Sequence, residues 1–220
     1  MHIPDGILPA AVAAGGYVVA GALTAYAMRQ VNRSENAQEQ IPKVALLTAA
    51  FFVASLIHIP IPPTSVHPLL AGLMGALLGW FSVPAIVIGL LLQALMFGHG
   101  GLTSLGVNAV IMAVPALVAH FVFQAGFNAK RSASWNAVFG FLAGGLGVGL
   151  TVLMFFGILI STISPNLIDP AAERAAIIGL TVAHIPLIII EGLLTGMLVT
   201  YLNRVKPELL GGLITADARA

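Results

Sequence analysis

The chain has 220 residues, of which 59% are hydrophobic and 8% are charged, and its formal net charge is +1. Soluble domains carry roughly 25% charged residues, so this composition excludes a soluble protein and indicates a polytopic membrane protein. The chain contains no cysteine, which excludes disulfides, thiolate metal sites and cysteine nucleophiles. No basic residue precedes the first apolar stretch, so we expect no cleaved signal peptide.

The sequence predicts an all-α membrane protein in which residues 1–220 form a single transmembrane domain. A short N-terminal segment, residues 1–9, leads into seven apolar stretches, of which the third and fourth are short for a membrane crossing of about 20 residues. One continuous segment over residues 67–97 would be too long for a single crossing, and Pro84 would break it, so we divide it in two. The seven predicted helices cover approximately residues 9–28, 44–60, 67–81, 83–97, 104–124, 136–162 and 174–202.

The basic residues are segregated by these seven predicted helices. With seven helices, eight of the nine basic residues lie on the same side of the membrane, and only Arg174 lies on the other. A count of six or eight helices would not separate them in this way. Because Lys and Arg concentrate in cytoplasmic loops, we expect the N-terminus outside and the C-terminus in the cytoplasm. The eight basic residues on the cytoplasmic side are Arg29, Arg33, Lys43, Lys130, Arg131, Arg204, Lys206 and Arg219.

Histidines gather on the opposite, outward side. The predicted cytoplasmic loops contain none, and four of the six in the chain lie on or near the outer face. Imidazole is the commonest protein ligand for transition metals, so this distribution predicts a metal site that faces the outside. The four histidines are His2, His58, His67 and His99.

The first two residues, Met1 and His2, form a chelating unit if the α-amine of Met1 is free. The amine and the His2 amide nitrogen close a five-membered ring on a metal, and the amide and imidazole Nδ1 close a six-membered ring. Such rings favour a planar arrangement, which suits Ni(II) or Cu(II) better than the tetrahedral Zn(II). The amide must lose a proton, so affinity should fall as pH drops. The alternative is an ordinary histidine on a frayed terminus.

The other polar residues of the outer side have less specific signals. His67 follows a stiff proline-rich loop and is either a fourth nitrogen ligand or an interfacial histidine in a turn. His99 is expected beside the ligands rather than among them, because four nitrogens already fill a plane. His58 is expected to be interfacial. Asp5 is expected to cap a turn that folds the terminus back, and a hydrogen bond to an imidazole is a second option.

Polar residues inside the apolar stretches are costly and need a role. Glu191 has three candidate roles: it neutralises a cation, accepts a proton or bonds to a neighbouring helix. His184 lies seven residues earlier, about 10 Å along a helix, so the two are not expected to touch. Gln93 and Asn108 are expected to join helices. The many small residues are expected to allow close helix packing, and a contact face for a partner membrane protein remains open.

Three motifs of this chain together resemble one family. They are MHIPDGIL over residues 1–8, VHPLLAG over residues 66–72 and GHGG over residues 98–101. They are similar to the CbiM/NikM substrate-binding (S) components of energy-coupling factor (ECF) transporters, which capture cobalt or nickel, and the similarity covers essentially the whole chain. It implies that the Met1 amine, the His2 amide and imidazole, and the His67 imidazole hold the metal. The sequence Ile-Pro-Asp-Gly at residues 3–6 resembles the nickel branch of the family more than the cobalt branch. The expected metal is therefore Ni(II), with Co(II) as the alternative.

The resemblance also implies partners: a transmembrane coupling (T) component, cytoplasmic ATPase subunits and a small accessory membrane subunit. The chain itself lacks the phosphate-binding motif G-x-x-x-x-G-K-[ST], because its three lysines precede Val44, Arg131 and Pro207. We therefore expect a transport component of the cell membrane, not an enzyme, with a metal ion as substrate and no organic cofactor. Two rivals remain: a self-sufficient cation carrier that uses Glu191, and an intramembrane metalloenzyme, against which a closed plane of four nitrogens argues.

Overall fold

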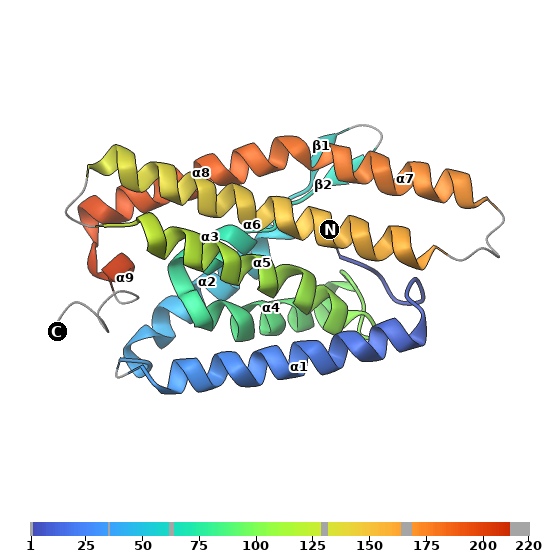
Figure 1. The fold of residues 1–220 in the computed structure, drawn as a ribbon, viewed down its shortest axis with the longest axis horizontal. Coiled ribbons are helices and arrows are strands. Elements are labelled where there is room, and N and C mark those ends of the chain that lie inside the picture. The colour runs from blue at the N-terminus through green and yellow to red at the C-terminus, as the bar shows by residue number, and fades with distance from the viewer. Residues whose placement is uncertain (1, 35, 62–63, 129–131, 164–168, 212–220) are drawn as a thin grey trace.

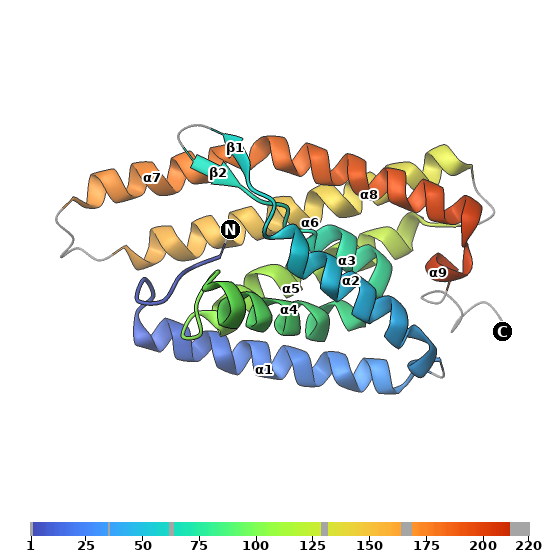
Figure 2. The ribbon, with the colours of Figure 1, turned by 180° about the vertical axis from the view of Figure 1, so that it is seen from behind.

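The computed structural model of the protein describes residues 2–34, 36–61, 64–128, 132–163 and 169–211, and most of these residues are helical (Figures 1 and 2). Helices are the expected outcome, because a chain in lipid must satisfy its own backbone hydrogen bonds. The helices are α1 (Ala10–Asn32), α2 (Ile41–Ala54), α3 (Ala71–Leu78), α4 (Ser82–Phe97), α5 (Leu105–Gly126), α6 (Ala133–Thr162), α7 (Pro170–Ala183), α8 (Ile185–Val205) and α9 (Glu208–Gly211), with short 3-10 helices η1 (Gln38–Gln40) and η2 (Gly79–Phe81).

Five stretches of the described chain are long and apolar enough to cross a membrane. Two of them combine consecutive helices, α3 with α4 and α7 with α8, and α2 is shorter than a span. The predicted all-α polytopic fold is therefore confirmed. The helix α1 begins at one end of the bundle and α8 ends at the other (Figure 1), as an odd number of crossings requires. The five stretches are Ala10–Asn32, Ala71–Phe97, Leu105–Gly126, Ala133–Thr162 and Pro170–Val205.

Three predicted helix boundaries are wrong. The helix expected over residues 44–60 ends at Ala54, because the following chain forms an antiparallel hairpin of β1 (Ile59–Ile61) and β2 (Thr64–Val66). The helix expected from residue 67 begins only at Ala71, after an extended segment that contains His67 and Pro68. The helix expected over residues 174–202 is two helices that meet at His184, just before Pro186, whose ring prevents an unbroken helix.

The helix α3 lies at the centre of the bundle, and all eight of its residues are buried. Glycines allow the close approach: a Cβ atom on Gly72 would overlap the Ala143 and Gly144 carbonyls of α6, and one on Gly75 would overlap the Ala116 carbonyl of α5. The expected packing of helices through small residues is therefore confirmed. A buried α3 also gives the segment that precedes it, residues 67–70, a rigid base.

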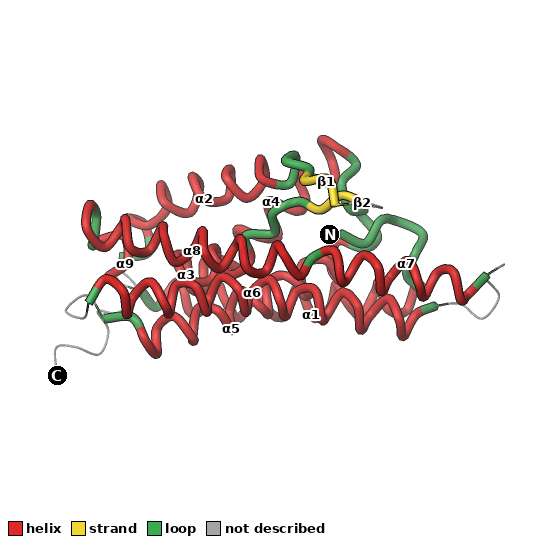
Figure 3. The backbone as a smooth tube through the Cα atoms, turned by 90° about the horizontal axis from the view of Figure 1, so that it is seen from above, coloured by secondary structure: helices red, strands yellow, loops and turns green. Residues whose placement is uncertain are grey.

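The N-terminal segment does not continue away from α1 but turns back toward the middle of the bundle. Figures 1 and 3 both place the N-terminal end beside the β1–β2 hairpin. Three segments far apart in sequence thus converge: the N-terminal segment, the chain that leaves β2, and the connection between α4 and α5. Each of them carries one of the outward histidines.

Candidate metal centre

The N-terminal segment is held at Ile3 by the side chain of Asn108 from α5. The Ile3 N–H donates to Asn108 Oδ1 at 2.9 Å, and Asn108 Nδ2 donates to the Ile3 carbonyl at 3.0 Å. The Ser104 hydroxyl donates to the same carbonyl, and Ile3 itself is 1% exposed. Its position in an apolar stretch predicted that Asn108 would join two helices. Its side chain instead fastens Ile3, the residue that follows His2.

Asp5 makes a second attachment, to the segment just before α5. Its carboxylate accepts hydrogen bonds from the Leu102 N–H at 3.1 Å, the Thr103 N–H at 2.8 Å and the Thr103 hydroxyl at 2.6 Å. These bonds, the one from the Thr103 hydroxyl foremost, hold the pKa of Asp5 below its usual value. Asp5 thus ties the folded-back terminus to a distant segment instead of capping its own turn as predicted, and none of its hydrogen bonds within the described residues reaches an imidazole.

The α4–α5 connection makes room for the terminus by using glycine. Gly100 has a φ of 85°, and a Cβ atom there would lie 3.2 Å from His2 Cβ. A Cβ atom on Gly101 would overlap the Asp5 carboxylate. The glycines around His99 thus serve both a left-handed turn and a close backbone approach.

His67 stands just after β2 and is 5% exposed. Its Nδ1 lies 3.1 Å from the Pro68 carbonyl oxygen. Because a carbonyl only accepts, Nδ1 carries the proton, and the lone pair of the neutral ring is on Nε2. Burial lowers the pKa of His67 to about 2, so the ring is neutral at physiological pH, as a metal ligand must be.

His99 is in hydrogen-bonding contact with a predicted ligand. Its Nε2 is 3.0 Å from Nε2 of His67, and burial lowers its pKa to about 4. Since the lone pair of His67 is on Nε2, the His99 Nε2–H is the donor of this hydrogen bond. His99 therefore touches the predicted ligand directly.

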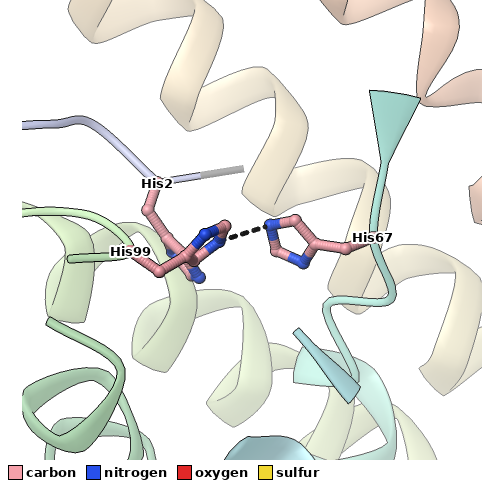
Figure 4. Close-up of side chains that lie close together, drawn as sticks. All are labelled: His2, His67 and His99. Carbon is pink, nitrogen blue, oxygen red and sulfur yellow. Dashed lines mark hydrogen bonds between the residues drawn. The ribbon is translucent and has the colours of Figure 1, made fainter. Parts of the chain in front are cut away.

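His2 completes a group of three imidazoles (Figure 4). Its ring centroid is 5.1 Å from that of His67 and 4.7 Å from that of His99. One ligand nitrogen from each of the three rings lies within 4.8 Å of the others. Both ring nitrogens of His2 are shielded from solvent without a hydrogen-bond partner among the described residues, and burial holds its pKa well below the usual range. Buried orphan nitrogens beside two neutral imidazoles fit a metal ion.

The remaining predicted residues lie around this group. Met1, the predicted amine ligand, falls outside the described residues. His58 is exposed at the rim, with its ring centroid 6.3 Å from those of His67 and His99, which agrees with its expected position away from the ligands. Gln93 donates to the Phe51 carbonyl at 3.3 Å and so joins α4 to α2, as expected. The Gln93 amide also lies beside the His2 ring, without a hydrogen bond of ordinary geometry.

Comparison with known proteins identifies the family of the chain. Residues 2–209 match the family described as the cobalt uptake substrate-specific transmembrane region, CbiM. The chain belongs to the CbiM family. The resemblance of its three motifs is thereby confirmed, and so is its classification as a multi-pass membrane transport component rather than an enzyme. Cobalt and nickel are the ions that this family takes up.

Individual CbiM relatives are similar over nearly the whole chain. Cobalt transport protein CbiM 1 of Pelobacter propionicus is 35% identical over 97% of this chain and 95% of its own length. Fused nickel transport protein NikMN of Rhodobacter capsulatus is 34% identical over 96% of this chain, which spans 64% of that protein. The crystal structure of a transition metal transporter superposes with a TM-score of 0.78 at 25% identity, with all of both chains covered.

Proposed function

We propose that this CbiM-family chain captures Ni(II) at the outer face of the cell membrane and delivers it for ATP-driven uptake as the S component of an ECF transporter. Co(II) uptake through the same site is the alternative. The observation that carries the proposal is the convergence of His2, His67 and His99, whose ligand nitrogens lie within 4.8 Å of one another. They come from three segments that lie far apart in the sequence.

In this proposal four nitrogens bind the ion in a plane: the Met1 amine, the His2 amide and imidazole, and the His67 imidazole. The lone pair of His67 is on Nε2, because Nδ1 donates to the Pro68 carbonyl; an ion at Nε2 takes the place of the His99 donor. The attachments of Ile3 and Asp5 support the chelate, since they place the backbone next to His2 against a rigid helix. A planar set disfavours Zn(II), which prefers a tetrahedron; Cu(II) binds at least as well as Ni(II), so its exclusion rests on availability.

Gln93 is a candidate hydrogen-bond acceptor for the His2 tautomer that chelation requires. Chelation uses Nδ1 of His2, so the proton of the neutral ring must sit on Nε2. The Gln93 side-chain oxygen is buried and without a partner among the described residues, and its amide group lies beside the ring. We infer that Nε2–H of His2 donates to that oxygen when Nδ1 binds the metal.

Charge and family membership support the proposed direction of transport and the proposed partners. The segregation of Lys and Arg favours an N-terminus and histidines outside and a C-terminus in the cytoplasm. Delivery then requires a transmembrane coupling component, cytoplasmic ATPase subunits and, in this proposal, a small accessory membrane subunit.

Equilibrium titration of the detergent-solubilised protein with Ni(II), Co(II) and Zn(II) tests the proposal. We expect one ion per chain, with Ni(II) bound most tightly of the three and Zn(II) most weakly. The His2→Ala variant is the control and should lose at least a hundredfold in affinity. Tighter binding of Co(II) would reassign the cargo, and tighter binding of Zn(II) would refute the planar site.

A further inference from the structure

Glu191 lies in the middle of α8 and is 2% exposed, although a carboxylate is costly inside a membrane protein. Its Oε1 accepts a hydrogen bond from the Leu69 N–H at 2.5 Å, and its Oε2 accepts one from the Leu70 N–H at 2.7 Å. Both oxygens are thus bound by backbone donors of the segment that leads into α3. This segment is 121 to 122 residues away in sequence.

The segment needs such a partner. Leu70 has a φ of 51°, the left-handed conformation that costs a residue with a side chain about 1 kcal/mol or more. The amides that precede a helix have no carbonyl one turn earlier to receive them, so a buried one needs an acceptor from elsewhere. A carboxylate that accepts two of them also sits at the positive end of the α3 dipole.

The same segment begins with His67. The Pro68 carbonyl accepts from His67 Nδ1, and the next two residues are the ones bound by Glu191. A continuous series of bonds therefore runs from α8 through the backbone to the imidazole, and it leaves Nε2 directed toward the other two histidines (Figure 4).

The base of this series is rigid. A Cβ atom on Gly144 of α6 would overlap the Glu191 carbonyl and the Thr195 side chain of α8, and one on Gly147 would overlap Gly72 of α3. The three helices α3, α6 and α8 are thus in backbone contact next to the carboxylate. A side chain fixed on such a frame can hold a ligand to within the small tolerance that a metal site requires.

We propose that Glu191 is a positioning residue for His67: its carboxylate fastens residues 69–70 to α8 and so fixes the imidazole that binds the metal. This inference rests on the proposed function. It gives the carboxylate a structural role, distinct from the cation or proton site considered for a self-sufficient carrier, because each of its oxygens accepts a backbone N–H.

The test compares Ni(II) binding by the wild type, Glu191→Gln and Thr195→Val. Glutamine keeps the shape but places an amide donor against a backbone N–H, so we expect Ni(II) affinity to fall about 10- to 100-fold and the visible absorption of the complex to shift. Thr195 is also buried and donates only within α8, to the Glu191 carbonyl at 2.8 Å. Thr195→Val should therefore stay within about threefold of the wild type.

A double-mutant cycle separates positioning from general loss of structure. In the His67→Ala background, Glu191→Gln should change the residual Ni(II) affinity by less than about threefold, because its effect acts through the missing imidazole. An equal loss in both backgrounds, or wild-type affinity in Glu191→Gln, overturns the inference. If Glu191→Gln fails to fold, Glu191→Asp keeps the charge and should lose affinity while His67→Ala/Glu191→Asp loses no more than His67→Ala. A wild-type protein that binds neither Ni(II) nor Co(II) refutes the proposed function instead.

Discussion

Nε2 of His99 donates a hydrogen bond to Nε2 of His67 across 3.0 Å, and this is the nitrogen that His67 has available for a metal. The two roles exclude each other, because one lone pair serves either a proton donor or an ion. Entry of the metal must therefore open this bond. In the proposed site, the ion replaces the His99 Nε2–H as the partner of His67 Nε2.

This relationship predicts a modest effect of His99→Ala. We expect Ni(II) affinity to remain within about tenfold of the wild type, because the four proposed ligands are intact and a neighbour of a ligand typically contributes 10- to 100-fold at most. Isothermal titration of the variant measures the change. A loss as large as that of His67→Ala would show that His99 is itself a ligand.

His67→Ala and His58→Ala form a matched pair of outer histidines. His67 is buried beside the rings of His2 and His99. His58 is exposed, and its ring centroid is 6.3 Å from that of His67. We expect removal of His67 to weaken Ni(II) binding by at least a hundredfold and removal of His58 to leave it within about twofold. Similar losses in the two variants would mean that the outer histidines act as a loose cluster.

The helical bundle was predictable from the sequence, and so was the docked terminus. Apolar length is a local property, and it predicts the presence of the helices, although not where three of them end, begin or break. The β1–β2 hairpin and the extended segment around His67 were not predictable in this way. Their apolar residues are of the same kind as those of the neighbouring helices, so the sequence places them in the end of one helix and the start of the next. The partners of Asn108 and Glu191 lie 105 and 121 or more residues away in the sequence. The periodicity of apolar residues gives no information about contacts over such separations. The only signal was that a polar residue inside a membrane needs a partner.

Asn108→Ala tests whether docking of the terminus supports the site. The substitution removes both hydrogen bonds to Ile3, about 1 kcal/mol each, so Ni(II) affinity should fall roughly 10- to 30-fold. Asn136→Ala is the control, because Asn136 pairs in the same two-way manner with the backbone of Asn128, at 3.1 and 2.9 Å. Its affinity should be unchanged. Equal affinities of the two variants would contradict a role for Asn108 in the site.

The stability of the metal-free protein should decrease as pH falls below 6.5. Burial lowers the pKa of His99 to about 4 and that of His67 to about 2, while both titrate near 6.5 in an unfolded chain. Between pH 6.5 and about 4 the unfolded state binds more protons, so acid favours unfolding; above 6.5 neither state binds them. Thermal unfolding in detergent from about pH 7 to about pH 5 measures the slope. His67→Ala should have a flatter slope, and a midpoint independent of pH would contradict the burial of neutral imidazoles.

The central claim is that the free amine of Met1 and the first peptide of the chain bind the ion together with two imidazoles. Its most direct test is a Ni(II) titration, followed by ultraviolet–visible absorption, of the wild type and of a variant with one residue added ahead of Met1. The account predicts a one-to-one yellow, square-planar complex for the wild type and none for the extended variant, which folds normally. A pale octahedral complex in the wild type, or an unchanged complex in the extended variant, would contradict it.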